Sequence, residues 1–235
     1  MKKLICILLA CTTCATAGIA FSGCSAGKGP VAPGYVVEET EPDLKQGDFG
    51  FFIIDKNQLM ATKYSGTEAN IVIPEAHDNY EVSVIGSSMF LDTNIETVSM
   101  PDTVTDIKDY AFASCENLTS VKLSKGLKRI GSNAFFNCPN LESVELPDTI
   151  EDLGVYAFCA TGLKSITIPE SVTELKESVF FQCKNLTEVY LPASLTNIRE
   201  GCFLECSEEL TIKAPKGSYA ETYATENNYK FEATE

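Results

Sequence analysis

The stretch from Met100 to Leu191 repeats one phrase of 22–23 residues four times, and this repetition limits the folds open to the chain. Looser copies lie on both sides, the first from Ile73 to Met100 and the last from Leu191 to Pro215. A fixed period of this length is typical of a solenoid, in which each unit buries its apolar face only against its neighbours. We therefore predict about six repeat units over residues 73–215, the first of them enlarged. Such an array offers an extended surface, which favours binding over catalysis.

Each unit contains two extended pieces and a turn. In the first piece Leu118, Val121 and Leu123 face inward while Ser120 and Lys122 face outward, which is the two-residue alternation of a strand. A proline usually ends this strand, because it has no amide for the ladder. A second short extended piece follows, and then an Ala-Phe pair that we expect in a single helical or 3₁₀ turn. The phenylalanines of successive units should stack into an internal column: Phe90, Phe112, Phe135, Phe158, Phe180 and Phe203.

The open ends of a solenoid need covers, because the terminal units lack a neighbour. Residues 48–72 predict a β-hairpin, with strands at Phe51–Ile54 and Leu59–Thr62. Residues 216–235 predict a capping helix and tail, since Ser218 and Glu221 have the spacing of a capping box. We expect this helix to run to about Asn227 and to pack Tyr219 and Tyr223 onto the last unit.

The first 23 residues have the features of a secretory signal. Lys2 and Lys3 precede an apolar run from Leu4 to Ala20, which is interrupted by threonines and ends in small residues. The Phe-Ser-Gly-Cys ending resembles a bacterial lipobox, and this resemblance implies that Cys24 carries a lipid. Cleavage without lipid attachment is the alternative. Residues 24–47, rich in glycine, proline and acids, then predict a disordered linker.

Removal of residues 1–23 would leave 16 basic and 33 acidic residues, a net charge of −17. This charge disfavours nucleic acid and anionic membranes as partners, and it is compatible with cations or a basic protein. Membrane contact is therefore expected only through the N-terminal lipid.

Of the ten cysteines, four occupy one repeat position, three residues after the phenylalanine: Cys115, Cys138, Cys183 and Cys206. Thr93 and Thr161 replace cysteine where the phrase is shorter, so the position requires a small buried side chain with a weak donor, facing the next unit. Free thiols are favoured, because stacked identical rotamers point in parallel, although neighbouring cysteines are within disulfide distance. Cys159 and Cys202 are predicted core residues.

The repeat phrase Pro-x-x-Val-x-x-Ile-x-x-x-Ala-Phe-x-x-Cys-x-x-Leu-x-x-Val-x-Leu closely resembles the BspA-type leucine-rich repeat of bacterial surface proteins. The resemblance extends from about Asp48 to Phe231 and includes both ends. It implies a mainly β, right-handed leucine-rich repeat solenoid with a parallel sheet on one side. It also implies adhesion or binding to host matrix proteins, but no catalytic residues.

The outward positions of the predicted sheet form the candidate binding face. They are Thr97, Ser99, Ser120, Lys122, Ser143, Glu145, Ser165, Thr167, Glu188, Tyr190, Thr211 and Lys213. Small hydroxyls dominate and Tyr190 is the single aromatic residue. This flat, hydrogen-bonding surface therefore favours a protein or peptide partner over a glycan. The competing interpretation is a solvated sheet face kept soluble by serine and threonine.

Two other charged features are interpreted as ordinary solvated surface. Acids after the prolines, such as Asp106 and Asp152, should stack beside Lys125, Lys128 and Arg129 and pair with them partially. A steering or cation-collecting patch is the alternative. His77 lies among acids in the enlarged unit and is interpreted as solvated. With one histidine and no Cys-x-x-Cys pair, the sequence predicts no metal, no cofactor and no enzyme activity.

The sequence thus predicts a lipid-anchored, extracytoplasmic monomer that binds a protein partner. Two alternatives remain open. In the first, the array is an envelope scaffold or spacer that organises other surface proteins and has no external ligand. The second, a hydrolase using an acidic pair, is less favoured because no nucleophile and base are visible.

Overall fold

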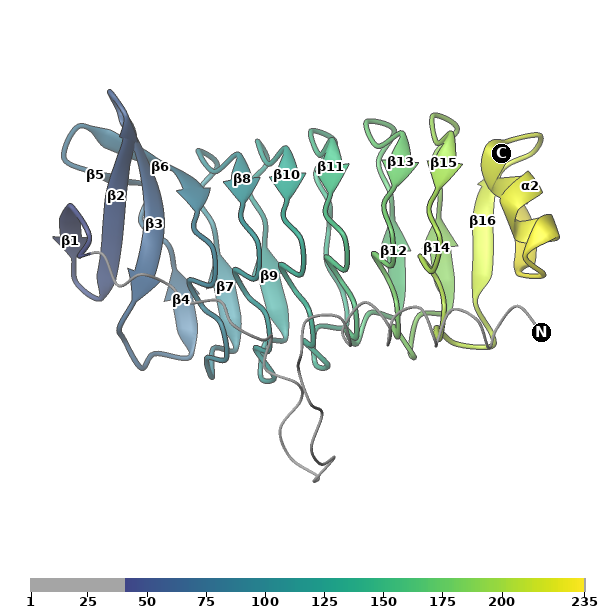
Figure 1. Cartoon of the computed structure of the whole chain (residues 1–235), viewed down its shortest axis with the longest axis horizontal. Coiled ribbons are helices and arrows are strands. Elements are labelled where there is room, and N and C mark those ends of the chain that lie inside the picture. The colour runs from purple at the N-terminus through teal and green to yellow at the C-terminus, as the bar shows by residue number, and fades with distance from the viewer. Residues whose placement is uncertain (1–40, 235) are drawn as a thin grey trace, which may run out of the picture. The chain divides into compact units, whose positions relative to one another are not determined.

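The computed structural model describes residues 41–234, which build one compact unit of stacked coils (Figure 1). The predicted signal, the predicted lipidation residue Cys24 and the predicted linker as far as residue 40 lie outside the described residues. Among residues 41–234, no helix is both long and apolar enough to cross a membrane. We define a coil as one repeat unit and identify it by its phenylalanine.

Parallel strands line the side of the coils where the sequence predicted a sheet (Figure 1). In chain order these strands are β4 (Asn70–Val72), β7 (Thr97–Ser99), β9 (Ser120–Lys122), β12 (Ser165–Thr167), β14 (Glu188–Tyr190), β16 (Thr211–Pro215) and β17 (Lys230–Thr234). Each coil places Thr, Ser or a charged residue outward and one β-branched residue inward. Val98, Val121, Ile166, Val189 and Ile212 are buried in this way, so the two-residue alternation sets the register.

The second extended pieces also pair in parallel, along the opposite side of the coils (Figure 1). Their strands are β6 (Tyr80–Ile85), β8 (Asp106–Ile107), β10 (Arg129–Ile130), β11 (Asp152–Leu153), β13 (Glu174–Leu175) and β15 (Asn197–Ile198). A short strand, β5 (Ala76–His77), pairs antiparallel with β6 in the enlarged first coil. The parallel sheet expected on one side is therefore accompanied by narrower parallel pairing on the other, which is broken between β11 and β13.

The first ladder is interrupted at residues 141–146, which form no strand although their apolar pattern predicts one. The interruption lies beside the place where the following repeat is one residue shorter. There Thr161-Gly162 stands in place of Cys138-Pro139-Asn140, and we call this segment the corner of the coil. There the corner lies so close to the preceding coil that a Cβ on Gly162 would stand 2.1 Å from the carbonyl oxygen of Pro139. A single backbone bond, from the Lys164 amide to the Glu142 carbonyl at 3.1 Å, follows this contact. The shortened corner thus accompanies the loss of regular strand pairing at residues 141–146.

The phenylalanine column is present as predicted. Phe90, Phe112, Phe135, Phe158, Phe180 and Phe203 are at most 2% exposed, and successive ring centroids lie 5.1–5.8 Å apart with interplanar angles of 2–12°. Burial of each ring stabilises the fold by roughly 1.5–3 kcal/mol. Tyrosines end the column, with Tyr64 against Phe90 at 5.4 Å and Tyr229 against Phe203 at 6.2 Å.

The turn that carries each phenylalanine is not the single helical or 3₁₀ turn that the sequence predicted. Two residues four positions apart have positive φ in every coil, for example Tyr110 at 59° and Ser114 at 57°. Between them the Phe112 amide donates to the carbonyl of Ala134 in the next coil, at 2.8 Å. A helical turn would direct that amide back along its own chain. The positive-φ residues redirect it, so the turns stack as a third hydrogen-bonded ladder.

The N-terminal cover is the predicted hairpin, formed by β2 (Phe49–Asp55) and β3 (Gln58–Tyr64). β3 continues into the second ladder by pairing with β6. The predicted disordered linker ends too late, because β1 (Leu44–Gln46) is ordered and pairs antiparallel with β2. The Asp43 carboxylate accepts a hydrogen bond from the Ile53 amide at 2.9 Å and secures this additional strand.

The C-terminal cover begins with the predicted helix, α2 (Tyr219–Glu226), which starts at the N-cap Ser218 and ends at Asn227. The Ser218 hydroxyl accepts a hydrogen bond from the Glu221 amide at 3.3 Å, as a capping box requires. The tail is not unstructured, because β17 pairs in parallel with β16 over five residues. The helix is therefore the crossover between two parallel strands and closes the last coil.

Candidate functional site

The structure brings most of the candidate face residues into two rows. In one row Thr97 faces Ser120, and Ser165 faces Glu188, which in turn faces Thr211. In the other row the register is Ser99 with Lys122, and Thr167 with Tyr190 and Lys213. The exposed members of the face are Ser120, Lys122, Ser143, Glu145, Ser165 and Thr167, and the others are half-buried.

The interruption at residues 141–146 divides this face into two patches. We define the first patch by Thr97, Ser99, Ser120 and Lys122. We define the second patch by Ser165, Thr167, Glu188, Tyr190, Thr211 and Lys213. Ser143 and Glu145 lie between them, exposed but outside any ladder. A flat partner would therefore meet two regular patches with an irregular strip between them.

The second patch contains a preorganised charged cluster. The Lys213 ammonium lies 2.9 Å from a Glu188 carboxylate oxygen and 5.2 Å from the centre of the Tyr190 ring, and the Tyr190 hydroxyl donates to Glu188 at 3.1 Å. The hydrogen bond from Lys213 holds the pKa of Glu188 below its usual range, and the same contact raises the pKa of Lys213. Both groups are therefore charged at neutral pH, and they fix the one aromatic ring of the face.

Sequence reasoning missed two contributors to this face. Glu232, on β17, lies 3.5 Å from the Lys213 ammonium. The only signal for it was the short alternation of Lys230, Phe231 and Glu232. Asn70, on β4, accepts a hydrogen bond from the Thr97 hydroxyl at 2.7 Å through its side-chain oxygen, and it extends the first patch by one strand.

The acidic and basic side chains that follow the prolines form a charged flank along the second ladder. They pair partially with one another, as the sequence predicted. Arg129 lies between Asp106 and Asp152, at 3.9 and 3.8 Å, because β8, β10 and β11 place the three residues in register. Lys125 pairs with Asp102 at 3.4 Å and Lys176 with Asp152 at 2.5 Å. Within residues 41–234, no group of three His, Cys, Asp or Glu side chains could hold a metal ion. The cation-collecting alternative thus has no support in the described part of the chain.

Two acids that follow prolines connect neighbouring coils. Glu170 accepts hydrogen bonds from the amides of Ser194 at 3.1 Å and Ala193 at 3.2 Å, and Asp102 accepts one from the Lys125 amide at 3.2 Å. These amide bonds lower the pKa of both carboxyl groups. The acids thus cap the turn of the following coil, which assigns them a structural role.

This geometry predicts a pH effect for Glu170→Gln. Because the folded pKa of Glu170 lies below its usual value of 4.5, its stabilising contribution is present above that pH and is lost as pH falls through the folded pKa. We expect the variant to lose less stability than wild type between about pH 6 and about pH 3. Thermal unfolding midpoints across this range check the prediction. Glu151→Gln is the control, and an equal change in both variants would contradict the capping role.

A profile of the BspA type leucine rich repeat region matches residues 83–210 in six copies, which is more than half of the chain. The chain belongs to the BspA-type leucine-rich repeat family. No curated protein matches the sequence. In the structure the phenylalanines of the repeats are buried, as are most of the small side chains three positions after them: Cys115, Cys138, Thr161 and Cys183.

Solved structures of bacterial leucine-rich repeat proteins show the same fold. A leucine-rich repeat protein from T. pallidum has a TM-score of 0.64 at 22% identity, covering 80% of this chain and 97% of that one. One from Bacteroides ovatus ATCC 8483 has 0.58 at 24%, covering 74% and 56% respectively. The pneumococcal vaccine antigen PcpA has 0.58 at 17%, covering 82% and 50%. The chain therefore spans only about half the length of the last two proteins.

The family's cysteine position is a hydrogen-bonded part of the core. The thiol of Cys115 donates to the Phe90 carbonyl at 3.0 Å, and Cys183 donates to Phe158 at 3.0 Å. The side chain thus faces the preceding coil, not the following one as the sequence interpretation had it. Thr161 makes the equivalent bond to the carbonyl of Phe158 in its own coil, at 2.8 Å. The six described thiols are free, and all except the half-buried Cys206 are buried.

Burial predicts that Cys115, Cys138, Cys159 and Cys202 are unreactive in the folded protein. It raises the pKa of Cys115 to about 11 and that of Cys159 to about 12, so almost no thiolate exists near neutral pH. We expect iodoacetamide to label these four thiols only after unfolding. Mass spectrometry of peptides from folded and urea-unfolded protein checks this. Rapid labelling of Cys115 or Cys159 in folded protein would contradict the burial of these thiols.

His77 has a more structural place than the solvated one predicted for it. It lies on β5 half-buried, and its ring stacks on the buried Phe51 with centroids 6.2 Å apart. Its Nδ1 lies 3.2 Å from the side-chain oxygen of Gln46 on β1, and its Nε2 lies 3.9 Å from Asp78. His77 thus helps to hold the N-terminal cover in place.

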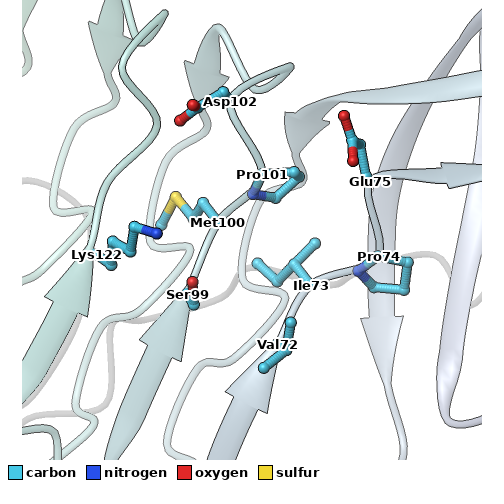
Figure 2. Close-up of a pocket in the computed structure, with 9 residues that line it drawn as sticks. All are labelled: Val72, Ile73, Pro74, Glu75, Ser99, Met100, Pro101, Asp102 and Lys122. Atoms are coloured by element: carbon cyan, nitrogen blue, oxygen red, sulfur yellow. The ribbon is translucent and has the colours of Figure 1, made fainter.

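A shallow hollow of about 400 Å³ lies where β4 and β7 end (Figure 2). Its lining residues are Val72, Ile73, Pro74, Glu75, Ser99, Met100, Pro101, Asp102 and Lys122. Ser99 and Lys122 belong to the first patch, so the hollow is continuous with the candidate face. Glu75 lies on one side of its apolar residues, and Asp102 and Lys122 lie on the other (Figure 2).

Proposed function

We propose that this protein is a lipid-anchored, extracytoplasmic surface protein that binds a protein partner through the two patches of its parallel strands. The observation that carries the proposal is the in-register exposure of hydroxyl side chains over successive coils, with the Glu188–Tyr190–Lys213 cluster fixed among them. A flat surface with hydrogen-bonding groups and one ordered aromatic ring suits a polypeptide. Fixed side chains lose little freedom on binding.

Membership of the family supports binding over catalysis, because leucine-rich repeats act generally in protein interactions and the comparisons indicate no catalytic family. The vaccine antigen PcpA, which shares the fold, supports a place at the cell surface. The anchor at Cys24 rests on the N-terminal pattern alone. Mass spectrometry of the mature N-terminus tests it, and an unmodified Cys24 would remove lipid attachment from the proposal.

The binding face is tested with two matched substitutions in adjacent coils. Thr167 is exposed on the second patch, and Thr173 is exposed outside the face, at the start of the next repeat unit. We expect Thr167→Arg to weaken capture of a saturable protein partner at least about tenfold, whereas Thr173→Arg leaves it unchanged. The measurement uses immobilised full-length protein and extracts of matrix and cell-surface proteins at physiological salt.

Three results would count against this proposal. Equal loss in both variants would remove the face from the interaction. Absence of any saturable partner would remove the external ligand. Crosslinking in the native cell that recovers only envelope proteins would favour the scaffold alternative.

A further inference from the structure

Within residues 41–234, the strand at which the first patch ends has no partner on its outer edge. The Thr97 amide donates to the Ala69 carbonyl at 3.1 Å, and the Ile73 amide donates to the Ser99 carbonyl at 3.0 Å. In a parallel ladder this alternation turns the backbone groups of Ala69, Ile71 and Ile73 toward β7. The groups of Asn70 and Val72 therefore point away from β7, and β4 is the terminal strand of its sheet.

β4 is short, but it has no charged residue, proline or bulge that would protect this edge. Proteins usually block an edge strand with a charged residue, a proline, a bulge or a covering segment. β4 is Asn-Ile-Val, and its pairing with β7 has no register shift. The Val72 side chain is 74% exposed, the most of any large apolar residue in the described part of the chain. An open edge with an exposed valine is the arrangement that accepts an additional strand.

The surroundings indicate the chemistry of that strand. Glu68 lies two residues before β4 and Glu75 three residues after it, and both are exposed. Within residues 41–234 neither forms an ion pair, whereas Asp102, Asp106 and Asp152 of the charged flank do. Val72 and Glu75 also line the hollow beside the edge (Figure 2). The edge therefore has an apolar centre and a free carboxylate at each end.

We propose that β4 binds an extended peptide segment of the partner by strand addition, and that this segment has an aliphatic centre flanked by lysine or arginine. The backbone groups of Val72 provide the new ladder bonds, and Glu68 and Glu75 select the basic flanks. This inference rests on the proposed function in taking the partner to be a polypeptide. Strand addition uses the edge of the sheet, whereas the proposed function uses its face. An experiment can therefore contradict one proposal and leave the other intact.

The test uses two synthetic peptides with full-length protein. Both have a Thr-Val-Ile-Val-Thr centre, one between lysine pairs and the other between glutamate pairs. We expect fluorescence anisotropy to show saturable binding of the lysine peptide and at least about tenfold weaker binding of the glutamate peptide. Hydrogen exchange on the wild-type protein should show new protection of the Val72 amide when the lysine peptide is bound.

Val72→Pro is the deciding variant. Proline removes the outward amide but leaves the β4–β7 bonds, which belong to Ile71 and Ile73, and edge strands tolerate it. We expect at least about tenfold weaker binding of the lysine peptide, while Val72→Thr, which keeps the amide, binds like wild type. Circular dichroism checks that both variants are folded. If Val72→Pro is not folded, protection of the Val72 amide in the wild-type protein decides the proposal instead.

Several outcomes would overturn strand addition. These are no saturable binding of the lysine peptide, equal binding of both peptides, binding unchanged in a folded Val72→Pro, or no protection at Val72. Concentration-dependent self-association abolished by Val72→Pro would assign the edge to a second copy of the chain. Loss of peptide binding in Thr167→Arg but not in Val72→Pro would leave the proposed function intact and remove only this inference.

Discussion

Phe135→Ala is expected to lower the free energy of unfolding by about 3–5 kcal/mol, the range for removal of a fully buried aromatic side chain. Phe135 is 0% exposed and stacks on both neighbours in the column, with centroid distances of 5.1 and 5.3 Å. Alanine would leave a cavity in the middle of the array, where neither adjacent coil can collapse without breaking its own ladder.

Urea unfolding followed by circular dichroism measures this loss. The adjacent Phe136 is the matched control, because it is half-buried and lies outside the column. We expect Phe136→Ala to cost less than half as much as Phe135→Ala. Equal losses would show that the column has no special part in the stability of the domain.

Gly162→Ala is expected to cost about 2–4 kcal/mol, because a Cβ at this position would lie 2.1 Å from the Pro139 carbonyl oxygen. The contact is with backbone, so no side-chain rotation relieves it. Gly126→Ala is the control, since its Cβ would be 3.1 Å from its nearest neighbour, the Asp102 carbonyl oxygen. A loss below about 1 kcal/mol is expected there. Similar unfolding midpoints for the two variants would contradict the tight corner.

The stacking of the coils was predictable because each unit repeats the same apolar positions at nearly the same spacing. Leu118, Val121 and Phe112 need only bury themselves against their counterparts in the next unit, and a period of 22–23 residues leaves one register that does so for all of them. The hairpin and α2 were predictable from local signals, namely the turn at Asp55-Lys56-Asn57 and the Ser218–Glu221 spacing.

The turns were not predictable from the same pattern. An Ala-Phe pair beside polar residues resembles one helical turn, and the residues with positive φ are as varied as Tyr110, Ser114 and Asn133. Among residues 41–234 only one of these positions is a glycine, Gly201 with φ 73°, so the sequence has little signal for the left-handed backbone. The bonds to the next coil compensate for the strain, and they exist only after the coils have stacked.

The candidate face was predictable in its residues but not in its continuity. Leu141, Val144 and Leu146 keep the apolar pattern of a strand, yet the corner that disrupts the ladder belongs to the following coil. β17 was missed because its alternation is short and follows a helix. The open edge at β4 could not be predicted either, since it depends on which strand is terminal in the sheet.

Native-state hydrogen exchange at the phenylalanine amides tests most directly whether the column holds the coils in register. The amides of Phe90, Phe112, Phe135, Phe158 and Phe180 each donate to a carbonyl of the following coil, at 2.8–3.0 Å. We predict that Phe112, Phe135 and Phe158 exchange only through global unfolding, with closely similar opening free energies. Exchange of any of these three amides within seconds at neutral pH would contradict the stacked coils and the binding surface derived from them.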